Sequence, residues 1–480
     1  MVFSDLFFLY VFLPAFALLY AGASIPKGCA FKNAVLVIFS LIFYAWGEPV
    51  YVFLMIGSAL INYIMGRNII RGNKRSKTAL VIGIAANIAI LATFKYLDFF
   101  IDIINNGIAF LTDASGLDCG MTIAGPSLKL PIGISFYTFQ SISYLVDVYR
   151  REAKEQKSFG NLLLYISMFP QLIAGPIVRY GTVAEGITSR KVSASDMAEG
   201  IQRFIIGLSK KVIIANQMSE VVDGLLAGSG GISSAGAWIG MAAFTLQIYF
   251  DFSGYSDMAI GIGRCIGFRF PENFNHPYCC SSITDFWRRW HMTLGGFFRD
   301  YVYIPLGGNR KHQAVNILVV WFLTGMWHGA SVNFILWGLY FGIIVMLEKY
   351  TILKVKKYIP DFILHIYALI LVFAGWGIFY FEDFDAMAVF FSSLTDFSGL
   401  YADIAEDSIG LVEMSALTDK FWLWIVAVIF CMPVRKLLSD RVKGHFIRIT
   451  VSVILSFALL ILCTALLVGA TNNAFIYTRF

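Results

Sequence analysis

One histidine lies within an apolar stretch of the chain, where an ionisable side chain is costly to place. His328 occurs in LTGMWHGASVNF, where Gly325 and Gly329 form a GxxxG pair that allows another helix to approach closely. Thr324 and Ser331 would share its face at helical spacing and supply hydroxyl neighbours. A neutral imidazole, with an ordinary pKa of about 6.5, can accept a proton from an alcohol. His328 is therefore a candidate general base; the alternative is a buried histidine that only links helices.

A second histidine, His291, lies in a long aromatic and basic segment, SITDFWRRWHMTLGGFFRDYVYIPLGGNRK. In one interpretation, this segment forms the mouth of a site, and its cations hold the phosphates of an anionic donor. Those cations are Arg288, Arg289, Arg299, Arg310 and Lys311. In the other, it is an amphipathic helix with aromatic side chains at headgroup depth and arginines on lipid phosphate. A further alternative is that these charges form structural ion pairs, Asp285 with Arg288 or Arg289 and Arg299 with Asp300.

Other polar signals are weaker. His276 lies three residues before Cys279, but no second His–Cys pair has ligand spacing, so we expect no metal. Asp251 and Asp257 fall in an apolar run and could indicate ion-coupled transport, although no inverted pair of broken helices accompanies them. GIGRCIG, at 261–267, departs from the dinucleotide fingerprint by one residue and follows a hydrophobic helix, which indicates helix packing.

The amino-acid composition indicates the class of protein that holds these candidate residues in place. The 480 residues are 58% apolar and 14% charged, whereas a soluble protein would be about 25% charged. Apolar runs of about 17 to 25 residues indicate membrane-spanning helices, since a membrane strand needs only about ten residues. We place the runs near 3–23, 31–47, 50–66, 78–94, 130–148, 203–226, 237–262, 314–330, 332–348, 361–381, 421–433 and 447–470. The predicted fold is therefore an all-α, polytopic membrane protein with 11 or 12 spanning helices.

Lys and Arg in the short loops set the orientation. The loop after the third run is strongly basic, and counting crossings from it places the segment 264–312 in the cytoplasm and both termini outside. The opposite loops, 95–119 and 382–420, are acidic. Two stretches, 95–110 and 159–180, could be interfacial or re-entrant. We therefore predict one membrane domain over 1–480, with the 264–312 segment inside and the tail 471–480 outside.

Several motifs together resemble one known family. The segment 268–312, which includes ITDFWRRWHMTLGGFFRDYVYIPLGGNRKH, is followed by TGMWHGASVNFILWG. This arrangement closely resembles the membrane-bound O-acyltransferases, and in particular their bacterial alginate-acetylation branch. FPQLIAGPIVRY at 169–180 and DFSGYSDMAIGIG at 251–263 fit the same branch. Local departures, which leave the class intact, lie at His276, Cys279, Cys280 and Gly295–Gly296.

The resemblance implies that an acyl group is transferred from a cytoplasmic thioester toward an acceptor on the outer side. It makes His328 the essential intramembrane histidine and His291 its companion on the cytoplasmic side. The C-terminal FIYTRF resembles a tail in which a tyrosine, here Tyr477, carries the acyl group briefly, although Thr478 and Arg479 differ from that pattern. A phenol needs a base to become a nucleophile, and His328 could serve. The alternative for Tyr477 is an aromatic anchor at the membrane interface.

The leading hypothesis is an O-acetyltransferase in the bacterial cytoplasmic membrane that takes acetyl from acetyl-CoA. An extracytoplasmic SGNH-type partner would then place the acetyl on a secreted polysaccharide or a cell-wall glycan. We expect no nucleic acid partner. D-alanyl transfer to teichoic acid, with a carrier protein as donor, is a second hypothesis. An ion-coupled transporter that uses Asp251, Asp257 and His328 is a third, from another class.

Overall fold

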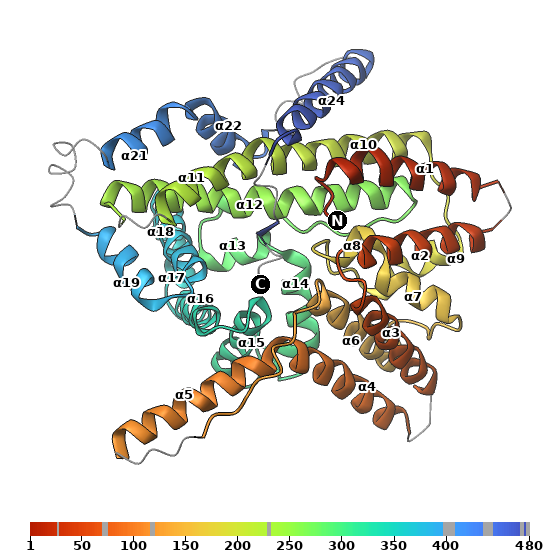
Figure 1. Ribbon diagram of the computed structural model, residues 1–480, viewed down its shortest axis with the longest axis horizontal. Coiled ribbons are helices and arrows are strands. Elements are labelled where there is room, and N and C mark those ends of the chain that lie inside the picture. The colour runs from red at the N-terminus through yellow and green to blue at the C-terminus, as the bar shows by residue number, and fades with distance from the viewer. Residues whose placement is uncertain are drawn as a thin grey trace.

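The chain forms a helical assembly in the computed structural model (Figure 1). The model describes residues 1–25, 28–69, 75–115, 121–227, 232–396, 409–434, 445–470 and 475–476. Throughout these ranges the regular elements are helices, and none is a strand. This observation confirms the all-α prediction. The physical reason is that a chain in a membrane can satisfy its backbone hydrogen bonds only in helices or closed barrels.

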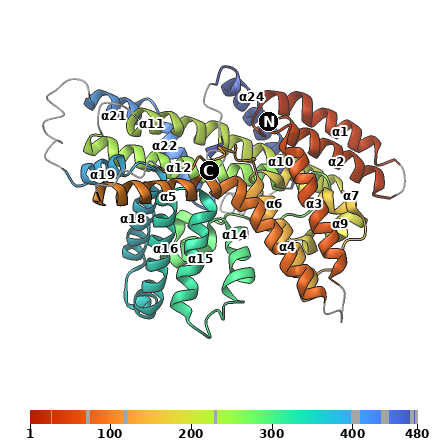
Figure 2. The same cartoon turned by 60° about the horizontal axis from the view of Figure 1, so that its bottom comes forward.

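A pair of long helices crosses the molecule (Figures 1 and 2). The first consists of α10 (Ala194–Ser209), a π-helical turn η3 (Lys210–Ala215) and α11 (Asn216–Leu226), which follow one another without interruption. The second, α12 (Ser234–Cys265), returns along both α10 and α11. A capping box of Ser193 with Asp196 begins the first helix. Both helices extend beyond the spans predicted at 203–226 and 237–262.

Glycines allow this close helix pairing. A Cβ atom at Gly207 would lie 2.5 Å from the carbonyl oxygen of Gly254. A Cβ atom at Gly261 would lie 2.6 Å from the carbonyl oxygen of Gly200. The two helix backbones could therefore not approach so closely if a larger residue replaced either glycine. Gly261 belongs to GIGRCIG, so the interpretation of that motif as a helix-packing element is confirmed.

The N-terminal elements pack together on one side of the long pair (Figure 1). They are η1 (Phe8–Phe12), α1 (Leu13–Gly22), α2 (Ala30–Ala45), α3 (Tyr51–Asn68), α4 (Arg75–Leu91), η2 (Ala92–Tyr96), α5 (Leu97–Ser115), α6 (Ile134–Arg150), α7 (Phe159–Ser167), α8 (Phe169–Leu172) and α9 (Tyr180–Thr188). Phe169 is fully buried among the rings of Phe8, Phe12 and Phe16. The uncertain stretch 159–180 thus contributes short helices to the core, whereas α5 projects from the bundle.

The remaining elements follow α12 in the chain (Figure 1). They are η4 (Pro277–Cys279), α13 (Ile283–Arg289), α14 (Met292–Phe298), η5 (Arg299–Tyr303), α15 (Gln313–His328), α16 (Val332–Tyr350), α17 (Ile352–Val355), η6 (Lys356–Tyr358), α18 (Asp361–Tyr380), α19 (Phe384–Ser393), α21 (Ile409–Thr418), α22 (Phe421–Cys431) and α24 (His445–Leu467). The short helices α13 and α14 contact each other, and α13 also contacts α16 and α18. The segment 264–312 is therefore built into the helix assembly.

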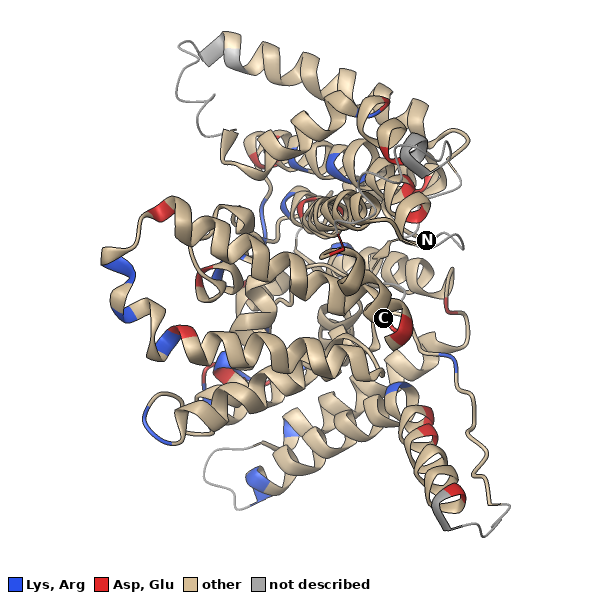
Figure 3. Ribbon diagram, turned by 90° about the vertical axis from the view of Figure 1, so that its left-hand side faces the viewer, with Lys and Arg blue, Asp and Glu red and all other residues tan. Residues whose placement is uncertain are grey.

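Four helical stretches among the described residues are long and apolar enough to cross a membrane. They are Arg75–Asp113, Val332–Tyr358, Asp361–Tyr380 and Ile449–Leu467, and shorter apolar helices accompany them. Many charged residues lie near helix ends and connections, while several long helical stretches carry none (Figure 3). The protein is a multi-pass membrane protein. The twelve-crossing map and the positions of both termini stay predictions.

Candidate active site

His328 is the last residue of α15, and its ring is buried. The helix ends there because Gly329 is extended, with φ −169° and ψ 162°, and α16 begins after Ser331. The rings of Trp337 and Phe379 meet the imidazole edge to face, with centroids 4.8 and 5.3 Å away. The imidazole is therefore held in an aromatic environment at a helix end.

The prediction that Thr324 and Ser331 supply hydroxyl neighbours to His328 is wrong in part. Ser331 does not share a helical face with His328, because α15 ends before it and Ser331 is the N-cap of α16. Thr324 is on α15, but its Oγ1 donates to the carbonyl oxygen of Val320 at 2.8 Å. This internal bond is common for threonine in apolar helices, and it commits the hydroxyl proton of Thr324 to the backbone.

The GxxxG prediction is confirmed by the packing of α15 on α16. A Cβ atom at Gly325 would overlap the carbonyl group of Phe334 and lie 3.3 Å from the Cα atom of Gly338. A Cβ atom at Gly329 would overlap the ring of Phe334. The two backbones therefore approach closely just before His328, which fixes the end of α15.

His291 is buried between α13 and α14, in a left-handed conformation with φ 42°. Its Nδ1 lies 3.0 Å from Oδ1 of Asn273. The same oxygen accepts the hydroxyl of Thr293 at 2.8 Å and its backbone N–H at 3.3 Å. Because a backbone N–H can only donate, the Asn273 atom is the oxygen, and Nδ1 of His291 must carry the proton. Nε2 then has the lone pair.

The Nε2 atom of His291 is available to a ligand. It is buried, and no hydrogen-bond partner for it occurs in the part of the chain that the structure describes. Burial lowers the pKa of His291, which lies in a segment connecting the spanning helices, to about 3. The ring is therefore neutral at physiological pH, and Nε2 can accept a hydrogen bond or a proton.

Trp327 lies between the two predicted histidines. Its ring centroid is 5.7 Å from that of His291 and 5.0 Å from that of His328. The structure thus brings together two histidines that are 37 positions apart in the sequence. Two neighbouring imidazoles in a buried aromatic site are suited to moving a proton.

The network behind His291 reaches another segment that the family resemblance had marked. The backbone N–H of Ile177, in FPQLIAGPIVRY, donates to Oγ1 of Thr293 at 3.0 Å. Nδ2 of Asn273 donates to Oγ of Ser256 on α12 at 3.1 Å. The position of the His291 ring is therefore set jointly by the 169–180 segment and by the long helix pair.

Sequence reasoning missed a buried lysine. Lys95 belongs to the π-helical turn η2, and its Nζ donates to the carbonyl oxygen of Trp327 at 2.5 Å. Oγ of Ser135 lies 3.5 Å from the same nitrogen. The hydroxyl of Tyr96 donates to the carbonyl oxygen of Met326 at 2.6 Å. The available signal was a single lysine between apolar runs, in LATFKYLDFF.

The alternative interpretation of FWRRW, as an interfacial amphipathic helix, does not fit the structure. Phe286 and Trp290 are almost completely buried, with 0% and 1% of their surfaces exposed. Trp287 packs against the rings of Trp321 and Phe341, each with a centroid 4.9 Å away. These aromatic side chains therefore hold α13 against α15, α16 and α18, since their large apolar surfaces are removed from solvent and lipid.

The five predicted donor-binding cations divide into two groups. Three are exposed and form no ion pair with any described residue: Arg288, Arg310 and Lys311. Two form ion pairs, Arg289 with Asp285 at 3.0 Å and Arg299 with Asp300 at 2.6 Å. The structure thus shows the structural pairs that the sequence left as an alternative, and it leaves the other three cations at the surface.

Asp300 joins a larger cluster than the sequence indicated. Its carboxylate also pairs with Arg179, whose guanidinium lies over the ring of Tyr301. Burial would raise the pKa of Asp300, but hydrogen bonds from Arg299 and Arg179 hold it below its usual range. Arg179 is the penultimate residue of FPQLIAGPIVRY, so the cluster links that segment to η5.

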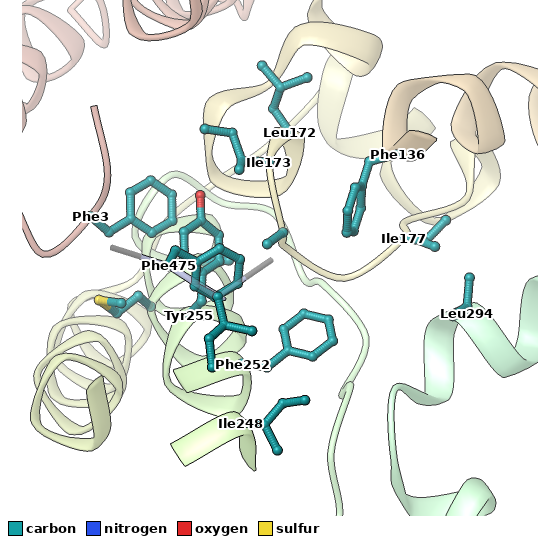
Figure 4. Packing of buried hydrophobic residues seen from close by; sticks show 14 of the residues in the cluster. Phe3, Phe136, Leu172, Ile173, Ile177, Ile248, Phe252, Tyr255, Leu294 and Phe475 are labelled. Carbon is teal, nitrogen blue, oxygen red and sulfur yellow. The ribbon is translucent and has the colours of Figure 1, made fainter. Parts of the chain in front are cut away.

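The described part of the C-terminal tail is docked inside the protein. The backbone N–H of Ile476 donates to Oδ2 of Asp251 at 2.8 Å. Phe475 is buried, and its ring centroid lies 4.8 Å from that of Tyr255 (Figure 4). Tyr477 lies outside the described residues. Phe475 also contacts Phe252, and the ring of Phe252 contacts that of His291 at 4.7 Å.

The intramembrane carboxylates have cationic partners. Asp251 pairs with Lys211 at 2.8 Å, in addition to its bond to the tail. Asp257 pairs with Arg203 and with Lys210, each at 2.7 Å. These pairs join α12 to α10 and η3, so a structural role accounts for both carboxylates.

No described side chains form an obvious metal centre. Nδ1 of His276 lies 3.1 Å from the carbonyl oxygen of Cys431. Sγ of Cys279 lies 3.6 Å from the same oxygen. Within the described ranges, no group of three His, Cys, Asp or Glu side chains is placed to hold a metal ion.

Comparison with known proteins agrees with this arrangement. Residues 148–390 match the model of the membrane-bound O-acyltransferase family. A probable alginate O-acetylase AlgI of Pseudomonas syringae pv. tomato is 39% identical over 403 residues, which cover 83% of this chain and 76% of that protein. A peptidoglycan O-acetyltransferase of Helicobacter pylori is 35% identical over 73% of this chain and 70% of its own length.

A teichoic acid D-alanyltransferase of Bacillus subtilis is 29% identical, but over only 48% of this chain and 62% of its own length. The matched region contains both buried histidines, Trp327 and the network that orients His291. The chain belongs to the membrane-bound O-acyltransferase family.

Proposed function

We propose that this enzyme transfers an acetyl group from cytoplasmic acetyl-CoA toward an extracytoplasmic polysaccharide or cell-wall glycan. The observation that carries the proposal is the pair of buried imidazoles, His291 and His328, on either side of Trp327. The similarity to an alginate O-acetylase and to a peptidoglycan O-acetyltransferase supports an acetyl donor and a glycan acceptor.

In the proposed reaction His328 acts as general base. Its imidazole takes the proton of the attacking hydroxyl, whose oxygen forms a bond to the acetyl carbonyl carbon. The carbonyl electron pair moves onto oxygen and returns as the C–S bond breaks. The departing thiolate takes the proton back from the imidazolium of His328. His291, with Nε2 as acceptor, would orient the thioester or assist this proton transfer.

The donor would approach the exposed cations of the 264–312 segment. Arg288, Arg310 and Lys311 are free of the ion pairs found for Arg289 and Arg299, and they suit the phosphates of coenzyme A. The two paired arginines would instead stabilise α13 and η5. This assignment places the donor on the cytoplasmic side of the predicted topology, with both termini outside.

An extracytoplasmic SGNH-type partner would complete the transfer to the glycan. D-alanyl transfer is the second candidate within the family, although the similarity to a D-alanyltransferase covers less of the chain. Ion-coupled transport is disfavoured, because Asp251 and Asp257 are engaged in ion pairs with neighbouring helices.

The central test replaces His328 by Ala in membranes supplied with labelled acetyl-CoA. Loss of the general base should lower acetyl transfer by roughly 10²- to 10⁴-fold, with the protein level in the membrane unchanged. His312→Asn is the matched control, since His312 is an exposed histidine just before α15 and asparagine tolerates its left-handed backbone. Full transfer by the His328→Ala variant would contradict the proposal, and transfer only from a D-alanyl donor would favour the second candidate.

A further inference from the structure

The proposed mechanism leaves the buried Lys95, which contacts Trp327, unexplained. Its side chain is buried, and no carboxylate in the described ranges pairs with it. An ammonium group inside a membrane protein is costly unless it is paired or used. Its acceptors are the carbonyl oxygen of Trp327 and, at 3.5 Å, the hydroxyl of Ser135.

The position of Lys95 relates it directly to the reacting group. Lys95 Nζ donates to the carbonyl oxygen of Trp327, which directly precedes His328 at the end of α15. An ammonium group has three N–H donors, and the two acceptors leave at least one N–H for a ligand. A π-helical turn often marks a functional site, since the extra residue changes which side chains face a neighbour.

We propose that Lys95 is a further catalytic residue, whose ammonium group stabilises the negative charge that develops on the acyl carbonyl oxygen. The inference rests on the proposed acyl transfer at His328. As the acceptor oxygen bonds to the carbonyl carbon, the carbonyl π pair moves onto oxygen, and an N–H of Lys95 donates to it. When the C–S bond breaks, the pair returns to the carbonyl and Lys95 remains protonated.

A fixed cation beside this oxygen would act where its effect is large. Lys95 and His328 are buried, and aromatic rings contact His328, so a charge interaction here is less screened than in solvent. Lys95 is also held in place before the reaction by its bond to Trp327, so little reorganisation is needed. Both properties characterise groups that stabilise an oxyanion.

The competing explanation is a purely structural one. Lys95 and Tyr96 donate to consecutive carbonyl groups at the C-terminal end of α15, which lack partners within the helix. Both residues could therefore simply cap the helix that carries His328. Tyr96 offers a matched control, because Tyr96→Phe removes the neighbouring cap without changing any charge.

The test compares Lys95→Gln, Lys95→Arg and Tyr96→Phe in acetyl transfer from labelled acetyl-CoA. Glutamine can keep an N–H for the carbonyl of Trp327 but has no charge, whereas arginine keeps the charge. We expect Lys95→Gln to lower kcat by about 10²-fold with the donor KM changed by less than about threefold. Lys95→Arg should retain at least about a tenth of the wild-type kcat, and Tyr96→Phe should be close to wild type.

Two results would overturn the role of Lys95. One is a kcat for Lys95→Gln within a few-fold of wild type; the other is an equal loss in Lys95→Gln and Tyr96→Phe, which indicates helix capping. Melting temperatures of the purified variants show whether a loss of kcat follows from unfolding; a loss that tracks a lowered melting temperature also counts against the role. Failure of the wild-type protein to transfer acetyl would instead contradict the proposed function itself.

Discussion

At the scale of single residues, the site depends on which ring nitrogen of His291 carries a proton. Asn273 determines this, because its Oδ1 accepts from Nδ1 of His291 and from Thr293. The lone pair is consequently placed on Nε2. Asn273 is a positioning residue, since it acts through His291.

We therefore predict that Asn273→Leu lowers kcat for acetyl transfer by roughly tenfold to 10²-fold, with the donor KM little changed. The reason is that the His291 ring would lose its fixed orientation and tautomer. Ser256→Ala is the control: it removes the acceptor of Asn273 Nδ2 but leaves the Oδ1 contact intact. Steady-state kinetics in membranes measure both. Wild-type kcat in Asn273→Leu, or an equal loss in Ser256→Ala, would exclude the orienting role.

The sequence predicts some residues of the site but not others, for a physical reason. His328 and His291 could be found because an imidazole in an apolar or aromatic run is unusual in itself. Lys95 contacts Trp327 across 232 positions, and Asn273 is an ordinary amide until its acceptor role is known. Residues defined by their partners become visible only when the fold brings those partners together.

At the scale of elements, the contact between α15 and α16 holds the buried histidine. Gly325 has no space for a side chain, because a Cβ atom would overlap the carbonyl group of Phe334. His328 follows three residues later, at the end of the same helix. A change in the distance between these two helices would therefore move the imidazole.

We predict that Gly325→Ala destabilises the protein by about 1–3 kcal/mol, since an added methyl group must force the two backbones apart. A lower melting temperature in detergent and a reduced rate of acetyl transfer should accompany each other. Gly296→Ala on α14 is the control, because a Cβ atom there meets nothing within 4 Å. A Gly325→Ala variant that melts with the wild type would show that α15 and α16 are not tightly constrained.

Helices could be predicted from the sequence where hydrophobicity alone determines their position. Apolar runs such as 332–348 and 361–381 correspond to α16 and α18, because membrane helices are determined by length and composition. The short helices α13 and α14 and the π turns have no such signal. The inward position of Trp290 could not be inferred, because an aromatic stripe suits both a membrane interface and a protein core.

At the scale of the whole molecule, the carboxylate of Asp251 connects the two long helices to the C-terminal tail. Lys211 on η3 pairs with Asp251 on α12, and Asp251 also accepts the backbone N–H of Ile476. The neighbouring Phe475 is buried against Tyr255. The end of the described chain is thus anchored in the core, although 225 positions separate Ile476 from Asp251.

This anchoring bears on the proposed role of Tyr477 as an acyl carrier. Tyr477 directly follows Ile476, and the ring of Phe252 contacts both Phe475 and His291. We propose that Tyr477 enters the site from this anchor. Its phenol oxygen would then bond to the acetyl carbon as the C–S bond breaks, and its proton would pass to the base.

We predict that Tyr477→Phe lowers acetyl transfer to the final acceptor by about 10²-fold or more, because it removes the nucleophilic oxygen but keeps the ring. With labelled acetyl-CoA, the wild-type protein should retain a label that hydroxylamine releases, and the Tyr477→Phe variant should not. Tyr358→Phe, at the exposed tyrosine that ends η6, is the control. Unchanged transfer in Tyr477→Phe would assign the tail an anchoring role, and the chemistry at His328 would then act directly between donor and acceptor.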